Sequence, residues 1–130
     1  IVLSTDLPDR ALFVAGDTQR LTQVLLNLLS NALRYTPVGG RVAVAARQAG
    51  DTVQVSVQDT GEGIPADELS LVFERFYRTD RARGRDTGGS GLGLTIARSL
   101  VEAQGGQIWA SSQEGAGSTF TFALPASVPA

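Results

Sequence analysis

The sequence predicts an α+β fold, a two-layer α/β sandwich in which three helices cover one face of a mixed, mostly antiparallel sheet. Two observations lead to this class. Three segments have the composition of helices, and in the first of them apolar residues recur at three- and four-residue steps. Two pairs of short segments with strand character are each joined by a turn, and strands joined by hairpins pair antiparallel.

The N-terminal third of the chain predicts strands followed by a long helix. Residues 1–5, "IVLST", resemble part of a strand, and residues 11–16, "ALFVAG", form a short apolar run that predicts another. Asp17 is a good N-cap residue. From there to Tyr35 the apolar spacing predicts an amphipathic helix, which Pro37 would end.

The remaining elements follow in order along the chain. Alternating residues predict a hairpin, a shorter helix follows a glycine-rich loop, and a third helix precedes a final hairpin. In this order the predicted segments are 41–48 and 52–59, then 66–77, then 91–104, then 106–113 and 117–125.

Composition and charge exclude several classes of function. The chain has 130 residues and a net charge of −2, so it has no general basic field for nucleic acid. It contains no cysteine and no histidine, which excludes thiolate metal sites and the commonest general base. No apolar run is long enough to span a bilayer. Catalysis would therefore depend on carboxylates, amides, arginine, hydroxyls, backbone groups or a bound ion.

The basic side chains are unevenly placed. All eleven are arginine, and several lie within "RFYRTDRARGR", residues 75–85. Such a run is often only a solvated loop. Its position directly before the glycines of residues 86–94, "DTGGSGLGL", favours a contact with an anion instead.

Asn27 and Asn31 are the first candidate binding residues. They are four apart in the first predicted helix, so they share a face at the edge of its apolar stripe. Asparagine is a poor residue inside a helix because its amide competes for backbone groups. The pair either bonds a neighbouring loop or presents amide oxygens, which suit a hydrated Mg²⁺ that also carries substrate phosphates. Arg34 and Tyr35 continue this side and could supply a phosphate contact and an aromatic face.

Asp59 ends a predicted strand and precedes "TGEGIP", residues 60–65. Aspartate and glycine favour turns, which is one explanation of this stretch. The other is a carboxylate that accepts a hydrogen bond from an exocyclic amine such as that of adenine. The neighbouring glycines would let a flat ligand approach the backbone, and Ile64 would pack on its ring plane.

The stretch "GGSGLGL", residues 88–94, opens the third predicted helix. Backbone N–H groups at a helix start bind anions together with the helix dipole, although glycine-rich runs are also common in linkers. The stretch lacks the Lys-Ser/Thr ending of a P-loop, and it is not a G-x-G-x-x-G sequence after a strand. A Rossmann site is therefore not expected.

Taken together, these motifs resemble a known family. The sequences "QVLLNLLSNALRYTP", "DTGEGIP", "FERFYR" and "GGSGLGL" are similar, in order and spacing, to the N, G1, F and G2 boxes of the ATP-binding catalytic domain of sensor histidine kinases. "GSTFTFALP" resembles the last strand of that family, so the resemblance covers nearly the whole chain. It implies the Bergerat fold shared with gyrase, the Hsp90 chaperones and MutL, with ATP bound between the first helix and a flexible lid.

The resemblance implies a role for each matching residue. Asn31 would hold Mg²⁺, and Asn27 would assist near the phosphates. Asp59 would bind the adenine amine, with Gly61 and Gly63 giving the nucleotide access.

Further roles follow from the same resemblance. Tyr35 and Ile64 would flank the adenine, Phe73 and Phe76 would anchor the lid, and Thr119 matches a position that supports the adenine end. The phosphates would be wrapped by the stretch Gly89, Ser90, Gly91, Leu92, Gly93 and Leu94.

Two departures from the family pattern concern arginines. Arg34 stands where many members have lysine; it keeps the charge and can bind bidentately, but it is bulkier and less mobile. The lid arginine of the family is best matched by Arg78, which has several arginine neighbours. With Asn27 and Asn31, these two residues complete the candidate catalytic set.

One position separates a kinase from an ATPase. The relatives that hydrolyse ATP use a glutamate one turn before the Mg²⁺ asparagine, and here that position is Asn27, which cannot act as a base. Gln23, one turn earlier, cannot either, so efficient hydrolysis is disfavoured. Phosphoryl transfer from ATP to a histidine is favoured, with the charge stabilised by Mg²⁺, arginine and helix-end amides.

Because this chain has no histidine, the resemblance implies an acceptor on a helical dimerisation domain of the same protein, upstream of Ile1. A response regulator receiver domain would act downstream, and no nucleic acid partner is expected. We expect residues 1–125 to form the catalytic domain and 126–130 a C-terminal tail. The isolated domain would be a cytoplasmic monomer, and the full-length protein a homodimeric, bacterial inner-membrane sensor.

Two alternative functions stay open. A serine/threonine kinase of the anti-sigma type shares the fold, although "FERFYR" favours the sensor-kinase form. A non-catalytic, nucleotide-sensing interaction module is the other, although every box is intact in this sequence.

Overall fold

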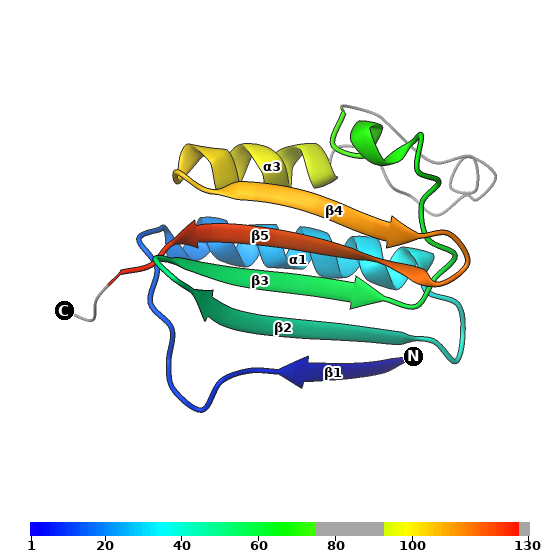
Figure 1. The fold of residues 1–130 in the computed structure, drawn as a ribbon, viewed down its shortest axis with the longest axis horizontal. Helices are drawn as coiled ribbons and strands as arrows, with labels where there is room; N and C mark the ends of the chain where they lie inside the picture. The colour runs from blue at the N-terminus through cyan, green and yellow to red at the C-terminus, as the bar shows by residue number, and fades with distance from the viewer. Residues whose placement is uncertain (75–92, 128–130) are drawn as a thin grey trace.

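A computed structural model describes residues 1–74 and 93–127, which contain five strands, two α-helices and one short 3₁₀ turn (Figure 1). In chain order these elements are β1 (Val2–Asp6), α1 (Thr18–Tyr35), β2 (Arg41–Ala49), β3 (Thr52–Asp59), the 3₁₀ turn (Leu69–Leu71), α3 (Gly93–Ala103), β4 (Gln107–Gln113) and β5 (Gly117–Pro125).

The five strands form one sheet in the order β1-β2-β3-β5-β4. β1 pairs parallel with β2, and the other three pairings are antiparallel. α1 packs on β3, α3 packs on β4 and β5, and the two helices pack on each other (Figure 1). The predicted two-layer sandwich with a mixed, mostly antiparallel sheet is confirmed.

The strand predicted at residues 11–16 is wrong. Only Val14 pairs there, in a single antiparallel bridge with Ala126, and the edge strand beside β2 is β1 instead. Val14 is partly buried against the hydrophobic core. The apolar run therefore indicates a segment that is partly buried beside the sheet. Apolar composition alone does not distinguish such a segment from a true strand.

The shorter helix predicted at residues 66–77 is also wrong within the described residues, and the expected count of three helices becomes two. The segment makes successive turns of the i→i+3 type, for example Leu71 N to Glu68 O at 2.9 Å and Glu74 N to Leu71 O at 2.9 Å. Val72 is 6 % exposed, and the adjacent Phe73 is partly buried against the same core. Tight turns allow two consecutive apolar side chains to enter the core.

α1 begins and ends where the sequence predicts. The Asp17 side chain accepts a hydrogen bond from the Arg20 N–H at 3.0 Å, as an N-cap residue does. Its fully buried stripe is Val24, Leu28 and Ala32. The helix stops because the residue before Pro37 is extended.

α3 continues the same hydrophobic layer. It buries Ala97 and Val101 against α1 and the sheet, and the chain leaves it through Gly105 with φ +81°. Its far end is tied back to α1 because Gln104 Oε1 accepts from the Asp17 N–H at 2.7 Å. Neither described helix is long and apolar enough to cross a membrane.

The core lies between the helices and one face of the sheet. In β5, residues alternate between the two faces, and Phe120, Phe122 and Leu124 point to the helices. On the opposite face, Trp109 of β4 remains 38 % exposed. Within the described residues, one face of the sheet is therefore covered by helices and the other faces outward.

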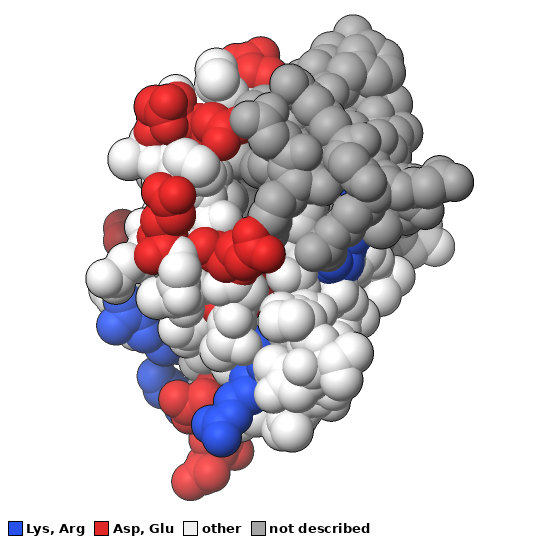
Figure 2. Space-filling view, turned by 90° about the vertical axis from the view of Figure 1, so that its right-hand side faces the viewer, with Lys and Arg blue, Asp and Glu red and all other residues white. Residues whose placement is uncertain are grey.

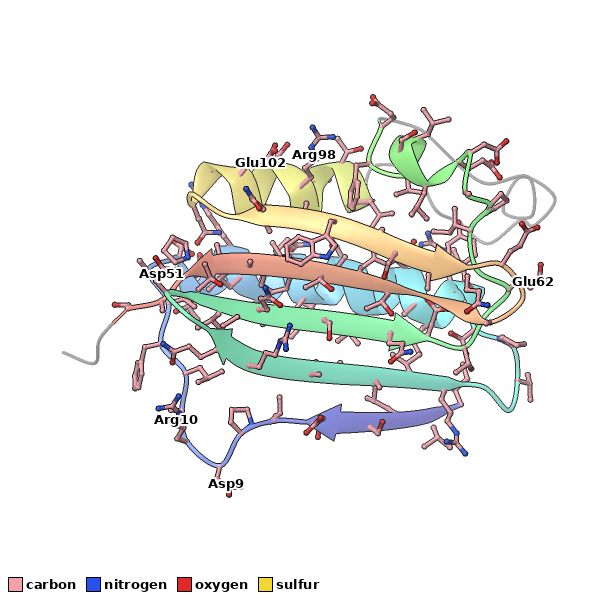
Figure 3. All side chains as sticks on the ribbon, in the orientation of Figure 1. Asp9, Arg10, Asp51, Glu62, Arg98 and Glu102 are labelled. Atoms are coloured by element: carbon pink, nitrogen blue, oxygen red, sulfur yellow. The ribbon has the colours of Figure 1, made fainter. Side chains whose placement is uncertain are left out.

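Replacing Asp17 with alanine removes the N-cap bond of α1. We expect the free energy of unfolding to fall by about 1 kcal/mol, within a range of roughly 0.5–2 kcal/mol. Equilibrium urea unfolding measures this change. Asp9→Ala, in the exposed loop after β1 (Figure 3), is the control and should change stability by less than about 0.5 kcal/mol. Equal losses in both variants would contradict a specific role for the cap.

Candidate functional site

Asp59 is a buried carboxylate at the end of the third strand. It is 2 % exposed, and β3 delivers it between Val42 of β2 and Ser118 of β5. Oδ1 accepts from the Gly61 N–H at 2.9 Å, and Oδ2 accepts from the Ser118 hydroxyl at 3.1 Å. These two donors compensate a burial that would otherwise be costly for a charged group, and they fix the orientation of the carboxylate.

The structure brings Ser118, and not Thr119, to this carboxylate. Directly paired residues of an antiparallel ladder share a face, and Asp59 pairs with Ser118. Thr119 pairs with Gln58 and Ser111, so it lies on the outward face of the sheet. Our sequence-based choice of Thr119 is therefore displaced by one residue from the position beside Asp59.

The loop after Asp59 is held against the β4–β5 hairpin. The Ile64 N–H donates to the Ser112 hydroxyl at 2.6 Å, and this hydroxyl donates to the Gly117 carbonyl at 3.0 Å. The Gly115 N–H donates to the Glu62 carbonyl at 2.6 Å. Figure 3 shows Glu62 at this end of the molecule, beside the hairpin turn. The loop is thus part of the rigid end of the sheet.

Gly61 and Gly63 each have a packing reason to be glycine. A Cβ at Gly61 would lie 2.5 Å from the Tyr35 carbonyl oxygen, so this loop touches the last turn of α1. Gly63 has φ +78°, and a Cβ there would lie 2.4 Å from the Gln113 carbonyl oxygen. Close packing therefore requires glycine at both positions, independently of the access for a ligand that the sequence analysis expects.

Asn27 joins α1 to the first turn of α3. Its Nδ2 donates to the Gly93 carbonyl at 3.0 Å, and its Oδ1 accepts from Gln23 Nε2 at 2.6 Å. The two bonds define which way the amide points. Asn27 therefore bonds a neighbouring element, which is one of the two explanations given for the asparagine pair. The element that it bonds is the start of α3, where the sequence predicts anion binding.

Asn31, Arg34 and Tyr35 follow along the same helix, and each is half-buried. Within the described ranges, the Asn31 amide makes no side-chain hydrogen bond. Arg34 lies in the last turn of α1, where a cation also interacts favourably with the helix dipole. From Asn27 to Tyr35 the helix rises by about 12 Å. The row of polar residues along α1 from Asn27 to Tyr35 therefore contacts α3 at one end and the loop after Asp59 at the other.

The donor set of this row fits a magnesium ion that brings other ligands with it. Among the described residues, no three acidic side chains are grouped so that they could hold a metal. Asn31 offers a neutral, hard amide oxygen that has no competing side-chain partner among the residues that the structure describes. Mg²⁺ commonly keeps several waters and binds substrate phosphates with few protein ligands, so one uncommitted amide oxygen is compatible with it.

Phe73 and Leu94 lie in the described part of the chain and pack partly against the core. The ring of Phe73 meets that of Phe120 edge-to-face, with centroids 6.0 Å apart. The Leu94 side chain is directed into the core, so only its backbone is available to a ligand. The other predicted binding residues lie outside the described residues: Phe76, Arg78, Gly89, Ser90, Gly91 and Leu92.

Among the residues that the structure describes, the charge on this end of the molecule does not by itself attract an anion. Figure 2 shows acidic side chains gathered over one side of this face, with basic ones mainly below them. Glu62 and Glu114, in the two loops joined here, are both exposed. The described groups that favour an anion are Arg34 and the start of α3.

Comparisons with known proteins agree with this geometry. A family model described as "Histidine kinase-, DNA gyrase B-, and HSP90-like ATPase" matches residues 16–128. The sensor histidine kinase WalK of Bacillus subtilis strain 168 is 51 % identical over 122 residues, which are 92 % of this chain and 20 % of that protein. SenX3 of Mycobacterium tuberculosis H37Rv is 45 % identical over 130 residues, which are 100 % of this chain and 32 % of that protein.

Solved structures give the same result. The mycobacterial sensor histidine kinase MprB superposes with a TM-score of 0.84 at 34 % identity, covering 95 % of this chain and 84 % of that one. Full-length ShkA in complex with AMPPNP has a TM-score of 0.85 at 33 % identity, covering 99 % and 26 %. Histidine kinase ThkA in complex with the response regulator protein TrrA has a TM-score of 0.78 at 29 % identity, covering 96 % and 34 %.

The chain therefore belongs to the histidine kinase-, DNA gyrase B- and HSP90-like ATPase family, as a catalytic domain of the sensor histidine kinase type. It spans about a fifth to a third of the length of the curated relatives named above.

Gly61→Ala and Gly93→Ala form a matched pair that tests whether close packing requires a glycine at each position. The first places a Cβ 2.5 Å from a backbone oxygen, whereas a Cβ at Gly93 meets no atom of the described residues within 4 Å. We expect Gly61→Ala to lower the free energy of unfolding by about 1–3 kcal/mol. Gly93→Ala should leave stability unchanged or raise it by up to about 1 kcal/mol. Urea unfolding of both variants tests this, and equal losses would contradict the steric argument.

Proposed function

We propose that this domain binds ATP with Mg²⁺ and donates the γ-phosphoryl group to a histidine on a separate dimerisation domain of its parent protein, in two-component signal transduction. One observation carries the proposal. A single helix, α1, touches the loop of a fixed buried carboxylate at its C-terminal end and the start of α3 near its middle. These two places suit the two ends of a nucleotide, because a carboxylate can bind the base and a helix start can bind the phosphate chain.

The base would bind at Asp59. An ionised carboxylate has about four acceptor positions, and the structure uses one on each oxygen. The remaining positions suit an exocyclic amine, which adenine has and guanine lacks at the same position. Because Ser118 and Gly61 hold the carboxylate, it needs little rearrangement to bind the base.

The phosphates would bind where α1 meets α3. Asn27 lies against Gly93, Asn31 is one turn further along α1, and Arg34 adds a positive charge beyond it. Unpaired N–H groups in the first turn of a helix attract phosphate. A bound Mg²⁺, held by Asn31, would neutralise developing phosphate charge.

Transfer to a histidine is favoured over hydrolysis. Asn27 is an amide whose oxygen already accepts from Gln23, so it cannot take a proton from water. The chain contains no histidine, so the acceptor lies elsewhere. The chain's own residues would orient the nucleotide and stabilise charge, which is the main protein contribution in phosphoryl transfer.

The named relatives support the wider setting of the proposal. ShkA forms a complex with AMPPNP, and ThkA forms a complex with a response regulator protein. We propose a receiver domain as the downstream partner here, with residues 1–125 as the catalytic domain, monomeric alone and part of a homodimer in the parent. A cytoplasmic position beneath a bacterial inner-membrane sensor is part of the same proposal.

Asp59→Asn should weaken ATP binding by about 10- to 100-fold, because a hydrogen bond to a charged group is worth roughly 1.5–3 kcal/mol. A titration with fluorescent ATP in the presence of Mg²⁺ measures the affinity. Asp67→Asn, an exposed acid that follows the same loop, is the control and should bind normally. Unchanged affinity of a folded Asp59→Asn variant would contradict the adenine role.

The isolated chain should bind nucleotide without labelling itself. Incubation with γ-labelled ATP should leave the chain unlabelled, whereas addition of the cognate dimerisation domain should produce an acid-labile, base-stable phosphohistidine on that domain. A label on serine or threonine of a partner would instead favour the anti-sigma type of kinase. A label on the isolated chain would contradict the proposal.

A further inference from the structure

Thr95 lies in the first turn of α3 and uses its hydroxyl outside its own helix. Oγ1 donates to the Phe73 carbonyl oxygen at 2.8 Å, a contact between residues 22 apart, and the pair is partly buried. Threonines near a helix start commonly bond local backbone groups. Here the hydroxyl instead connects the helix to the chain that follows the 3₁₀ turn.

The acceptor of this bond is itself fixed to the sheet. The Phe73 ring packs edge-to-face on Phe120, with centroids 6.0 Å apart and an interplanar angle of 84°. Phe120 is 2 % exposed and lies two residues after Ser118 on the same face of β5. Val72, directly before Phe73, is 6 % exposed. The residue whose carbonyl receives the Thr95 hydroxyl is therefore anchored in the core by its own ring and by the side chain that precedes it.

The first turn of α3 is consequently held at two points. Asn27 Nδ2 binds the Gly93 carbonyl from α1 at 3.0 Å, and Thr95 binds the Phe73 carbonyl at 2.8 Å. These two bonds, to different elements, fix the first turn in addition to the core packing of Ala97 and Val101 further along α3. The direction of its N–H groups is then set by the core rather than by the ligand.

We infer that Thr95 is a positioning residue, which aims the first-turn N–H groups of α3 at the phosphates of a bound nucleotide; this inference rests on the proposed function. Phosphate binding at a helix start depends on the direction of those groups, and pre-set donors lose less on binding than mobile ones. Thr95 itself touches no ligand in this role. Its loss should therefore affect phosphate contacts and spare the base.

The test compares two substitutions at one position. Thr95→Val keeps the branched shape and removes the donor, whereas Thr95→Ser keeps the hydroxyl. Calorimetric titrations of the full chain with AMPPNP and with adenosine, in Mg²⁺ buffer, report the phosphate and base contacts separately. We expect Thr95→Val to weaken AMPPNP binding about 3- to 10-fold, with adenosine affinity within about twofold of wild type. Thr95→Ser should match wild type for both.

A second variant reaches the same contact from the other side. Phe73→Leu removes the ring that anchors the carbonyl while leaving Thr95 in place, and it should show the same selective loss of AMPPNP affinity. Thr52→Val is the matched control, because the Thr52 hydroxyl also donates to a backbone carbonyl, that of Ala49 at 3.0 Å, but at the β2–β3 turn, the opposite end of β3 from Asp59; it should bind both ligands normally.

The outcomes separate this inference from the proposed function. If Thr95→Val binds AMPPNP as wild type does, or loses AMPPNP and adenosine equally, the inference is overturned and the proposed function stands. If wild type binds neither ligand, the proposed function itself fails and the inference fails with it. A Thr95→Ser variant as weak as Thr95→Val would also overturn it, since the hydroxyl would then not be the active group.

Discussion

The hydrogen-bonded burial of Asp59 is the constraint on which the rest of the site depends. A carboxylate that is 2 % exposed would be costly without donors, and the fold supplies them from the next loop and from β5. The surrounding backbone has to approach closely for this: a Cβ at Gly117 would lie 2.0 Å from the Asp59 carbonyl oxygen. Gly117 of β5 and Gly61 of the loop after β3 are thus both needed for the backbone to surround the carboxylate this closely.

α1 converts this local arrangement into a site with two ends. Its amphipathic spacing buries one stripe and leaves its amides at the edge next to α3. The same helix is contacted by Gly61 at its last turn. Because the helix is rigid over this length, the distance between the base end and the phosphate end is determined by helical rise. The Phe73–Phe120 contact and the Thr95 bond connect these two ends through the core as well.

Elements with a strong period could be predicted from the sequence, whereas pairings and tight turns could not. α1 and both hairpins agree with prediction because their patterns follow directly from helical and strand geometry. The choice between Ser118 and Thr119 depends on which face of β5 each residue occupies. Phe120 could have indicated this from the sequence, because an aromatic residue that faces the core places every second residue of the strand on the same face. The helix predicted at residues 66–77 failed because adjacent apolar residues such as Val72 and Phe73 fit successive i→i+3 turns as well as a helix, so the apolar pattern did not distinguish the two. Thr95 carries no sequence signal, since its partner is a backbone carbonyl.

The long separation between the two partners of the Asp59–Ser118 bond has a consequence for how the protein folds. The two residues are 59 positions apart, so pairing β3 with β5 closes a long loop that contains α3 and β4. Such non-local pairings carry a large loop-closure cost and form slowly. We therefore expect the hydrogen bonds of this carboxylate to be completed late in folding. A ligand that requires this carboxylate binds only the finished domain, so its presence stabilises the native state selectively by mass action.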